Sequence, residues 1–305
     1  MKTNVLNRRE FLTACGAFAA FELVGAPADE SPLVRFGVLT DCHYADKNPL
    51  IGGHPVNGDM YYRDSEYKMQ RFVAVMNERM PDFVVELGDF KDRSADNDSP
   101  SKDKTLGFLE KIETEYAKFN GPRYHVLGNH DMDQFLTKGD FFSKITNDGV
   151  TPTCGHYSFE RGGVKFLALD SCYTEDRDDK PFENENWRGS GIYIPPAERA
   201  WLATELAAAR KRPVVAFCHH RLDPNASSGM AVHNAAAIRA IFKESQKVHA
   251  VFTGHEHVGG TCNLDGVFYY SLRGMTVDPK ESANSFAEVS VYPSGRVSIT
   301  HFAKV

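Results

Sequence analysis

The sequence contains no block of basic residues, no C-x-x-C metal pattern, no internal repeat and no low-complexity tract. Because its lysines and arginines are scattered and its net charge is −6, a nucleic-acid polymer is a poorly supported partner. The six cysteines are widely spaced, so no thiolate metal site is indicated. What remains is a globular composition, 42% hydrophobic and 25% charged over 305 residues, which suits one large α/β domain or two small ones.

The N-terminal segment has the pattern of a targeting signal rather than of a fold. Residues 7–12 (NRREFL) match the twin-arginine export pattern of bacteria, and residues 26–28 (APA) match an A-x-A cleavage site. We therefore predict an export signal over 1–28, a single domain over 29–305, and a periplasmic or other extracytoplasmic location. The apolar stretch is shorter than the about 20 residues that span a bilayer, so no stable membrane insertion is expected after signal removal. An untidy soluble N-terminus, or a lipoprotein site at Cys15, is the alternative.

The rest of the chain alternates strand-like and helical segments. Strands are predicted at Leu33–Thr40, Phe83–Leu87, Tyr124–Leu127, Val164–Leu169, Val214–Phe217 and Ala250–Thr253. Helices are predicted at Ser65–Arg79, Leu106–Phe119, Pro195–Arg210 and Ala235–Phe242. The last segments, Val267–Leu272, Phe286–Tyr292 and Arg296–His301, have no helix between them and predict an antiparallel meander.

Five of the apolar runs end in acidic, amide or imidazole side chains. Strands separated by helices imply a largely parallel sheet, in which ligands bind beyond the carboxyl ends of the strands. We therefore expect one edge of one sheet to collect Asp41, His43, Asp89, Asn129, His130, His219, His255 and His257.

Such carboxylate, amide and imidazole ligands suit Mn²⁺, Fe or Zn²⁺ rather than a thiolate-bound metal. There are too many for one tetrahedral ion and about enough for two. Two ions roughly 3.5–4 Å apart need a bridging carboxylate and can hold a phosphoryl group between them.

The motifs occur in the order found in one known family. They are D-x-H at Asp41, G-D-x-x-D at Gly88, G-N-H-D at Gly128, a later histidine, and G-H-x-H at Gly254. This series resembles the calcineurin-like metallophosphoesterases. The resemblance implies a four-layer α/β/β/α sandwich of two mixed sheets, with a centre of two divalent metal ions at the sheet edge. It implies a hydrolase in which a metal-bound hydroxide attacks phosphorus.

The resemblance also assigns roles. The first metal would be held by Asp41, His43, Asp89 and His257, and the second by Asp89, Asn129, His219 and His255, so that Asp89 bridges the two. His130 would stabilise the phosphoryl oxygens or protonate the leaving group, and Asp131 would orient His130. Asp92 is either a partner of a ligand or a loop cap.

A closer resemblance is to the manganese-dependent ADP-ribose/CDP-alcohol diphosphatases. It is carried by residues 41–46 (DCHYAD), 61–63 (YYR) and 254–260 (GHEHVGG). It implies manganese as the favoured metal and a small phosphorylated substrate, a nucleoside diphosphate conjugate. One departure is His43, where members of that family often carry glutamine.

The same resemblance suggests residues for the substrate. Tyr62 and Arg63 would supply an aromatic wall and a phosphate contact, Arg221 would reach a second phosphate, and Asn234 would contact substrate. Their structural alternatives are a solvated helix start, a surface arginine and a helix N-cap. Other functions left open are a phosphomonoesterase, a cyclic-nucleotide phosphodiesterase, and a non-catalytic module that binds metal or phosphate.

Overall fold

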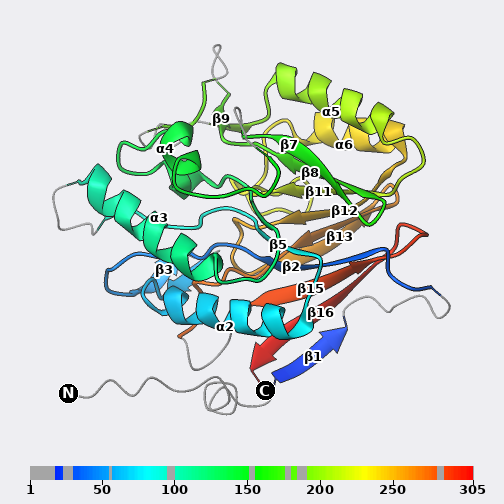
Figure 1. Cartoon of the computed structure of the whole chain (residues 1–305). Coiled ribbons are helices and arrows are strands. Elements are labelled where there is room, and N and C mark those ends of the chain that lie inside the picture. The colour runs from blue at the N-terminus through cyan, green and yellow to red at the C-terminus, as the bar shows by residue number, and fades with distance from the viewer. Residues whose placement is uncertain are drawn as a thin grey trace.

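The computed structural model describes residues 18–22, 30–54, 57–94, 100–150, 155–175, 180–183, 191–279 and 285–304. Two six-stranded mixed sheets pack face to face, and helices cover the outer face of each, as Figure 1 shows. This is the four-layer α/β/β/α sandwich that the resemblance implied.

The first sheet has the strand order β1-β16-β15-β2-β5-β6. Its strands are β1 (Phe18–Glu22), β2 (Val34–Leu39), β5 (Phe83–Glu86), β6 (Arg123–His125), β15 (Phe286–Val291) and β16 (Val297–Lys304). Three strands lead toward polar motifs, β2, β5 and β6, and they run parallel to one another. Strand β15 runs antiparallel to both of its neighbours, β2 and β16. The first sheet therefore brings three polar motifs to one edge.

The second sheet has the order β13-β14-β12-β11-β8-β7. Its strands are β7 (Tyr157–Arg161), β8 (Val164–Leu169), β11 (Val214–Cys218), β12 (Val248–Thr253), β13 (Gly260–Leu264) and β14 (Val267–Ser271). The four central strands are parallel, and β7 and β13 close the two sides as antiparallel hairpin partners. Two small ribbons accompany these sheets: β3 (Leu50–His54) with β4 (Gly58–Met60), and β9 (Tyr173–Thr174) with β10 (Ile192–Tyr193).

Three buried apolar clusters separate the four layers. Phe36, Phe166 and Phe217 belong to the cluster between the two sheets, where their ring centroids lie 5.6–5.7 Å apart. The outer clusters bury the helices against the sheets. The helices are α2 (Asp64–Arg79) and α3 (Lys102–Tyr116) on the first sheet, α5 (Pro196–Ala208) and α6 (Ala235–Ser245) on the second, and the short η1 (Asn129–Met132) and α4 (Lys138–Phe142).

The predicted C-terminal meander is wrong in its partners. β14 runs parallel to β12 in the second sheet, whereas β15 and β16 form an antiparallel hairpin in the first. The alternation of side chains identifies a strand but not the sheet that accepts it, because a strand with two apolar faces fits the core of either.

Part of the predicted export signal lies within the described residues. Residues 18–22 pair antiparallel with β16, from Phe18 opposite Lys304 to Glu22 opposite Thr300. Arg8, Arg9 and the expected cleavage site after Ala28 lie outside the described residues, so cleavage stays a prediction. No helix in the described ranges is long and apolar enough to cross a membrane.

Candidate metal centre

The polar motifs converge, but from two sheets rather than one. Asp41, His43, Asp89, Asn129 and His130 follow strands of the first sheet, and the other three histidines follow β11 and β12 of the second. The expectation of a single sheet edge is therefore corrected. The carboxyl ends of both sets of strands meet at one end of the sandwich, which doubles the number of loops that can supply ligands.

Asp89 occupies the centre of the cluster. Its Oδ2 lies 3.4 Å from His43 Nε2 and 3.3 Å from His219 Nε2. One carboxylate thus faces an imidazole from each sheet, which is the position that a bridging ligand requires.

The remaining predicted ligands surround this carboxylate. Asp41 Oδ1 lies 3.3 Å from His257 Nε2 and 3.8 Å from His43 Nε2. The ring of His255 lies 5.1 Å from that of His219 between centroids. Sets of possible ligand atoms within 4.8 Å of one another include Asp41–His43–His257 and Asp41–Asp89–His219.

The unsatisfied atoms of the cluster fit bound cations. His43 Nε2, His219 Nε2, His257 Nδ1 and Asn129 Nδ2 are buried and have no hydrogen-bond partner among the described residues. Buried polar atoms are almost always paired, so four orphans around two carboxylates need another partner. Divalent ions would supply that partner for the three imidazole nitrogens, whereas the amide nitrogen of Asn129 does not ligate a cation.

Electrostatics favour ionised carboxylates here. Burial alone would raise the pKa of Asp41, but the facing His257, His43 and His219 hold it well below the usual range. Burial likewise opposes ionisation of Asp89, and nearby His219 and His130 reverse the effect, so its pKa is lowered. The ionised carboxylate is the form that ligates a cation.

Two of the imidazoles have opposite shifts. Burial would lower the pKa of His43, but the carboxylates of Asp41, Asp92 and Asp89 raise it to about 10. Burial and the neighbouring His219 lower the pKa of His255 to about 3, so this ring is neutral and has a lone pair to donate.

The outer nitrogens of the ligand histidines are held as metal-binding histidines usually are. His43 Nδ1 lies 2.9 Å from Asp92 Oδ2, and Lys47 Nζ donates to the other oxygen of Asp92 at 2.6 Å. His219 Nδ1 donates to the carbonyl of Leu87 at 2.8 Å. Such outer contacts fix ring orientation, so Asp92 holds the ring of His43, a predicted ligand, and it also accepts the backbone N–H of Arg93 at 2.7 Å.

The backbone at the cluster is unusual. Four of its residues have left-handed φ angles: Asp41 (50°), His43 (46°), Asp89 (55°) and His255 (65°). Non-glycine residues adopt this region rarely and concentrate in it at functional sites. Gly88 (φ 102°) has no room for a side chain, because an added Cβ would lie 2.6 Å from His219 Nδ1.

His130 lies beside the cluster, with its ring centroid 4.9 Å from that of His43. Its Nδ1 lies 2.6 Å from Asp133 Oδ2. The predicted partner, Asp131, instead accepts backbone N–H bonds from Asp89 at 3.1 Å, Phe90 at 3.0 Å and Gly128 at 2.8 Å. The structure therefore corrects the role of Asp131, which shapes the loops around Asp89, and gives the orientation of His130 to Asp133.

The sequence did contain a signal for this contact. Residues 129–132 form the 3₁₀ turn η1, in which side chains three positions apart eclipse one another. His130 and Asp133 have that spacing, whereas adjacent residues such as 130 and 131 do not face each other.

Two predicted substrate residues lie at the start of α2. Tyr62 is 6% exposed, and Lys47 Nζ lies 4.0 Å from the centroid of its ring. Arg63 donates to Asp46 at 2.5 Å and to Asn48 at 3.0 Å, and it lines a cavity of about 490 Å³. Tyr62 therefore supports Lys47 and, through it, Asp92, while substrate contact by either residue stays a prediction.

The other two predicted substrate residues, Arg221 and Asn234, follow strand β11 of the second sheet. Arg221 is 3% exposed, and its guanidinium forms a two-point ion pair with Asp223, at 2.9 and 2.8 Å, and another bond with Glu256. Asn234, at the N-cap of α6, bonds both the N–H and the carbonyl of Ile194. These contacts link loops around the cluster and leave direct substrate contact as a prediction.

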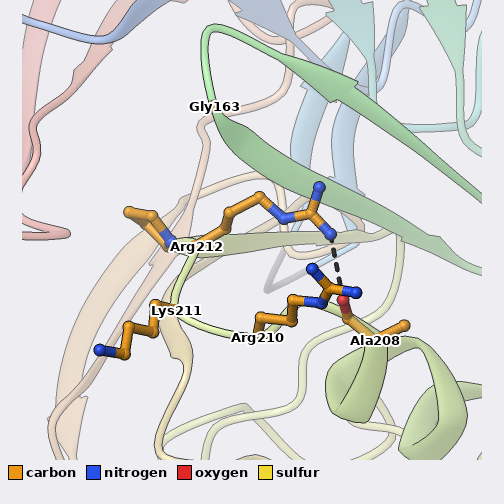
Figure 2. Close-up of a pocket in the computed structure, with 6 residues that line it drawn as sticks. Gly163, Ala208, Arg210, Lys211 and Arg212 are labelled. Carbon is orange, nitrogen blue, oxygen red and sulfur yellow. Dashed lines mark hydrogen bonds between the residues drawn. The ribbon is translucent and has the colours of Figure 1, made fainter.

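A second cavity, of about 840 Å³, lies at the amino ends of β8 and β11, away from the metal cluster (Figure 2). Arg210, Lys211 and Arg212 line it. Arg212 donates to the carbonyls of Ala208 at 3.0 Å and Ala209 at 3.1 Å, which caps the C-terminus of α5. The helix end therefore gives Arg212 a structural role.

Comparison with known proteins agrees with this geometry. The profile of the calcineurin-like phosphoesterases matches residues 34–259. The manganese-dependent ADP-ribose/CDP-alcohol diphosphatase of Oryza sativa subsp. japonica is 27% identical over 303 residues, 87% of this chain and 90% of the relative. The diphosphatase of the same name from Bos taurus is 24% identical over 322 residues, 88% and 93% of the two chains.

Solved structures share the fold. A dimetal phosphatase from Danio rerio superposes with a TM-score of 0.73 at 19% identity, covering 90% of this chain and 98% of that one. The fold and the cluster together define a metal-dependent hydrolase of phosphoesters that uses two divalent metal ions. The chain belongs to the calcineurin-like phosphoesterase family.

Proposed function

We propose that this protein is a manganese-dependent diphosphatase that hydrolyses the pyrophosphate bond of small nucleoside diphosphate conjugates such as ADP-ribose or CDP-choline. The observation that carries the proposal is similarity along nearly the whole chain to relatives named for that activity, at 87% and 88% coverage of this chain. The ligand residues named above are complete in this chain, which supports a working enzyme rather than a silent binding module.

We assign the first metal to Asp41, His43, Asp89 and His257, and the second to Asp89, Asn129, His219 and His255. When bound, two such ions polarise the phosphoryl group and lower the pKa of water to near neutrality. Burial of the carboxylates keeps their charge effective, because little bulk water is present to screen it.

His130 supplies the remaining chemistry. With Nδ1 held by Asp133, its Nε2 can donate a hydrogen bond or a proton to the oxygen that leaves phosphorus. Water adds to phosphorus, the P–O bond of the anhydride breaks, and two monophosphates result. His130 therefore acts on the leaving oxygen and Asp133 keeps the ring in place.

The test is a substrate panel with Mn²⁺, Fe²⁺ and Zn²⁺ added to metal-free protein. We expect AMP from ADP-ribose and CMP from CDP-choline, with the highest rate in Mn²⁺. Activity confined to aryl phosphates would identify a phosphomonoesterase instead, and activity confined to 3′,5′-cyclic nucleotides would identify a cyclic-nucleotide phosphodiesterase. Replacing His130 by alanine should lower turnover about 10²–10⁴-fold while metal content is retained, and unchanged turnover would remove His130 from the mechanism.

We further propose that the protein is exported by the twin-arginine route. Arg8 and Arg9 within NRREFL support this, together with the A-x-A pattern ending at Ala28. Expression with both arginines replaced by lysine should move the protein from the periplasmic to the cytoplasmic fraction, and an unchanged distribution would reject the twin-arginine route.

A further inference from the structure

His220 follows the proposed ligand His219, is fully buried, and has both ring nitrogens engaged. Its Nδ1 lies 2.7 Å from Ser171 Oγ, and its Nε2 lies 3.1 Å from Asn129 Oδ1. Ser171 follows β8 and lies 3.4 Å from Cys218 Sγ. These contacts form a continuous hydrogen-bonded chain from the interior of the second sheet to Asn129.

The side-chain amide of Asn129 lies at the end of this series of hydrogen bonds. Its Nδ2 is buried without a hydrogen-bond partner. An amide nitrogen does not ligate a divalent cation, whereas an amide oxygen does. The two ends of a carboxamide are assigned from their hydrogen bonds, since oxygen and nitrogen look nearly alike. Exchanging them leaves every heavy-atom distance unchanged and turns the oxygen toward the unsatisfied side.

We propose that His220 is a positioning residue that holds the Asn129 oxygen toward the metal by accepting a hydrogen bond from the Asn129 amide nitrogen. In this arrangement Asn129 Nδ2–H donates to His220 Nε2, His220 Nδ1–H donates to Ser171 Oγ, and Ser171 Oγ also accepts from the Cys218 thiol. Each step uses a distance already in the structure. The inference rests on the proposed function only in requiring that Asn129 is a ligand.

The main competing role for His220 is direct metal ligation. Its ligand atoms lie within 4.8 Å of those of His219 and His255, so the three could in principle share an ion. However, ligation through either nitrogen of His220 would break a hydrogen bond, either with Ser171 or with Asn129. A neutral histidine that accepts at one nitrogen and donates at the other satisfies both neighbours.

The decisive measurement is the protonation pattern of His220 in protein loaded with two Zn²⁺ ions, a diamagnetic substitute for Mn²⁺. Long-range ¹H–¹⁵N spectra of histidine-labelled protein distinguish a protonated, an unprotonated and a metal-bound ring nitrogen. We expect Nδ1 protonated and Nε2 unprotonated and free of metal. A proton or a metal on Nε2 would overturn the proposal.

Metal binding to variants supplies a second readout that does not depend on turnover. Titration of metal-free protein with Mn²⁺, followed by calorimetry, should show one of two sites weakened about 10- to 100-fold by His220→Ala, as expected for loss of an outer partner. Ser171→Ala should weaken the same site less, and it serves if His220→Ala fails to fold. The matched control is His249→Ala, a histidine at the amino end of β12, which should leave both sites unchanged.

Asn129→Ala distinguishes metal ligation by Asn129 from the positioning role of His220. If it weakens one site while His220→Ala does not, Asn129 remains a ligand and the positioning role of His220 is rejected. If Asn129→Ala leaves both sites intact, the ligand assignment and the inference both fail, but diphosphatase activity in the substrate panel can still stand.

Discussion

Asp131 and Asp133 can be distinguished by replacing each with asparagine. Asp131 accepts three backbone N–H bonds in the loops around Asp89, whereas Asp133 accepts from the ring of His130 at 2.6 Å. Asparagine keeps the shape of either side chain but removes its charge and one acceptor oxygen. The first change should therefore affect stability, and the second should affect turnover.

The magnitudes follow from these contacts. Hydrogen bonds to a charged group contribute about 1.5–3 kcal/mol each, so Asp131→Asn should destabilise the protein by about 3 kcal/mol. With an unfolding entropy of about 2.1 cal/mol/K per residue, that corresponds to a fall in Tm of about 5 °C for a chain of 305 residues. Proton transfer by a positioned side chain contributes about 10²–10⁴-fold, so Asp133→Asn, which withdraws the charge that stabilises the imidazolium, should lower kcat about 10- to 100-fold.

The assay is thermal unfolding of the metal-loaded protein together with steady-state kinetics on ADP-ribose. Asp133→Asn should leave metal content and KM unchanged. Asp103→Asn, an exposed carboxylate in the first turn of α3, is the control and should change neither Tm nor kcat. The reasoning is refuted if Asp131→Asn lowers kcat at unchanged Tm while Asp133→Asn leaves kcat intact.

Three other perturbations test separate parts of the structure. Asp89→Asn should reduce the metal bound per chain below two, measured by elemental analysis; two tightly bound ions would exclude Asp89 as the bridge. Arg221→Ala leaves the carboxylate of Glu256 buried, so it should lower the unfolding free energy in urea by about 3 kcal/mol or more; a higher KM at unchanged stability would instead indicate a substrate contact. Burial lowers the pKa of Lys68 from 10.5 in the unfolded chain to about 8 in the folded protein. The unfolded chain therefore binds more protons between pH 8 and 10.5, so the free energy of unfolding that Lys68 contributes is highest above about pH 10.5 and declines as the pH falls toward 8. Metal-free protein should therefore gain stability relative to Lys68→Met between pH 8 and 10.5, and parallel pH curves would contradict this.

Much of the architecture was predictable because the apolar periodicity is strong. The predicted strand Leu33–Thr40 contains β2, and the predicted helix Ser65–Arg79 differs from α2 only at its first residue. The ribbon of β3 and β4 was missed, because its Gly-Gly sequence and exposed Leu50 and Ile51 give no alternation of buried side chains.

The cluster was predictable for a different reason. Side chains that follow the carboxyl ends of parallel strands must gather, so Asp41, Asp89 and His257 could be grouped without knowing any distance. Which sheet each strand joins, and which carboxylate contacts His130, depend on packing between distant segments and on the geometry of a single 3₁₀ turn. Local periodicity does not encode the first, and the spacing of His130 and Asp133 reveals the second only once residues 129–132 are known to form a 3₁₀ turn.

The left-handed residues of the metal centre have a consequence for engineering heat resistance. An L-residue in this conformation costs roughly 1–2 kcal/mol relative to its relaxed state, and glycine relieves that cost. Replacement by glycine is not useful at Asp41, His43, Asp89 and His255, because it would delete a proposed ligand.

Left-handed φ angles also occur at residues that are not proposed ligands. Met80 (φ 52°) ends α2 and Gln246 (φ 54°) ends α6, both at positions where helices commonly carry glycine. A thermostable variant of this fold should therefore be sought by glycine replacement at these helix ends. The left-handed residues of the proposed metal centre should be left unchanged.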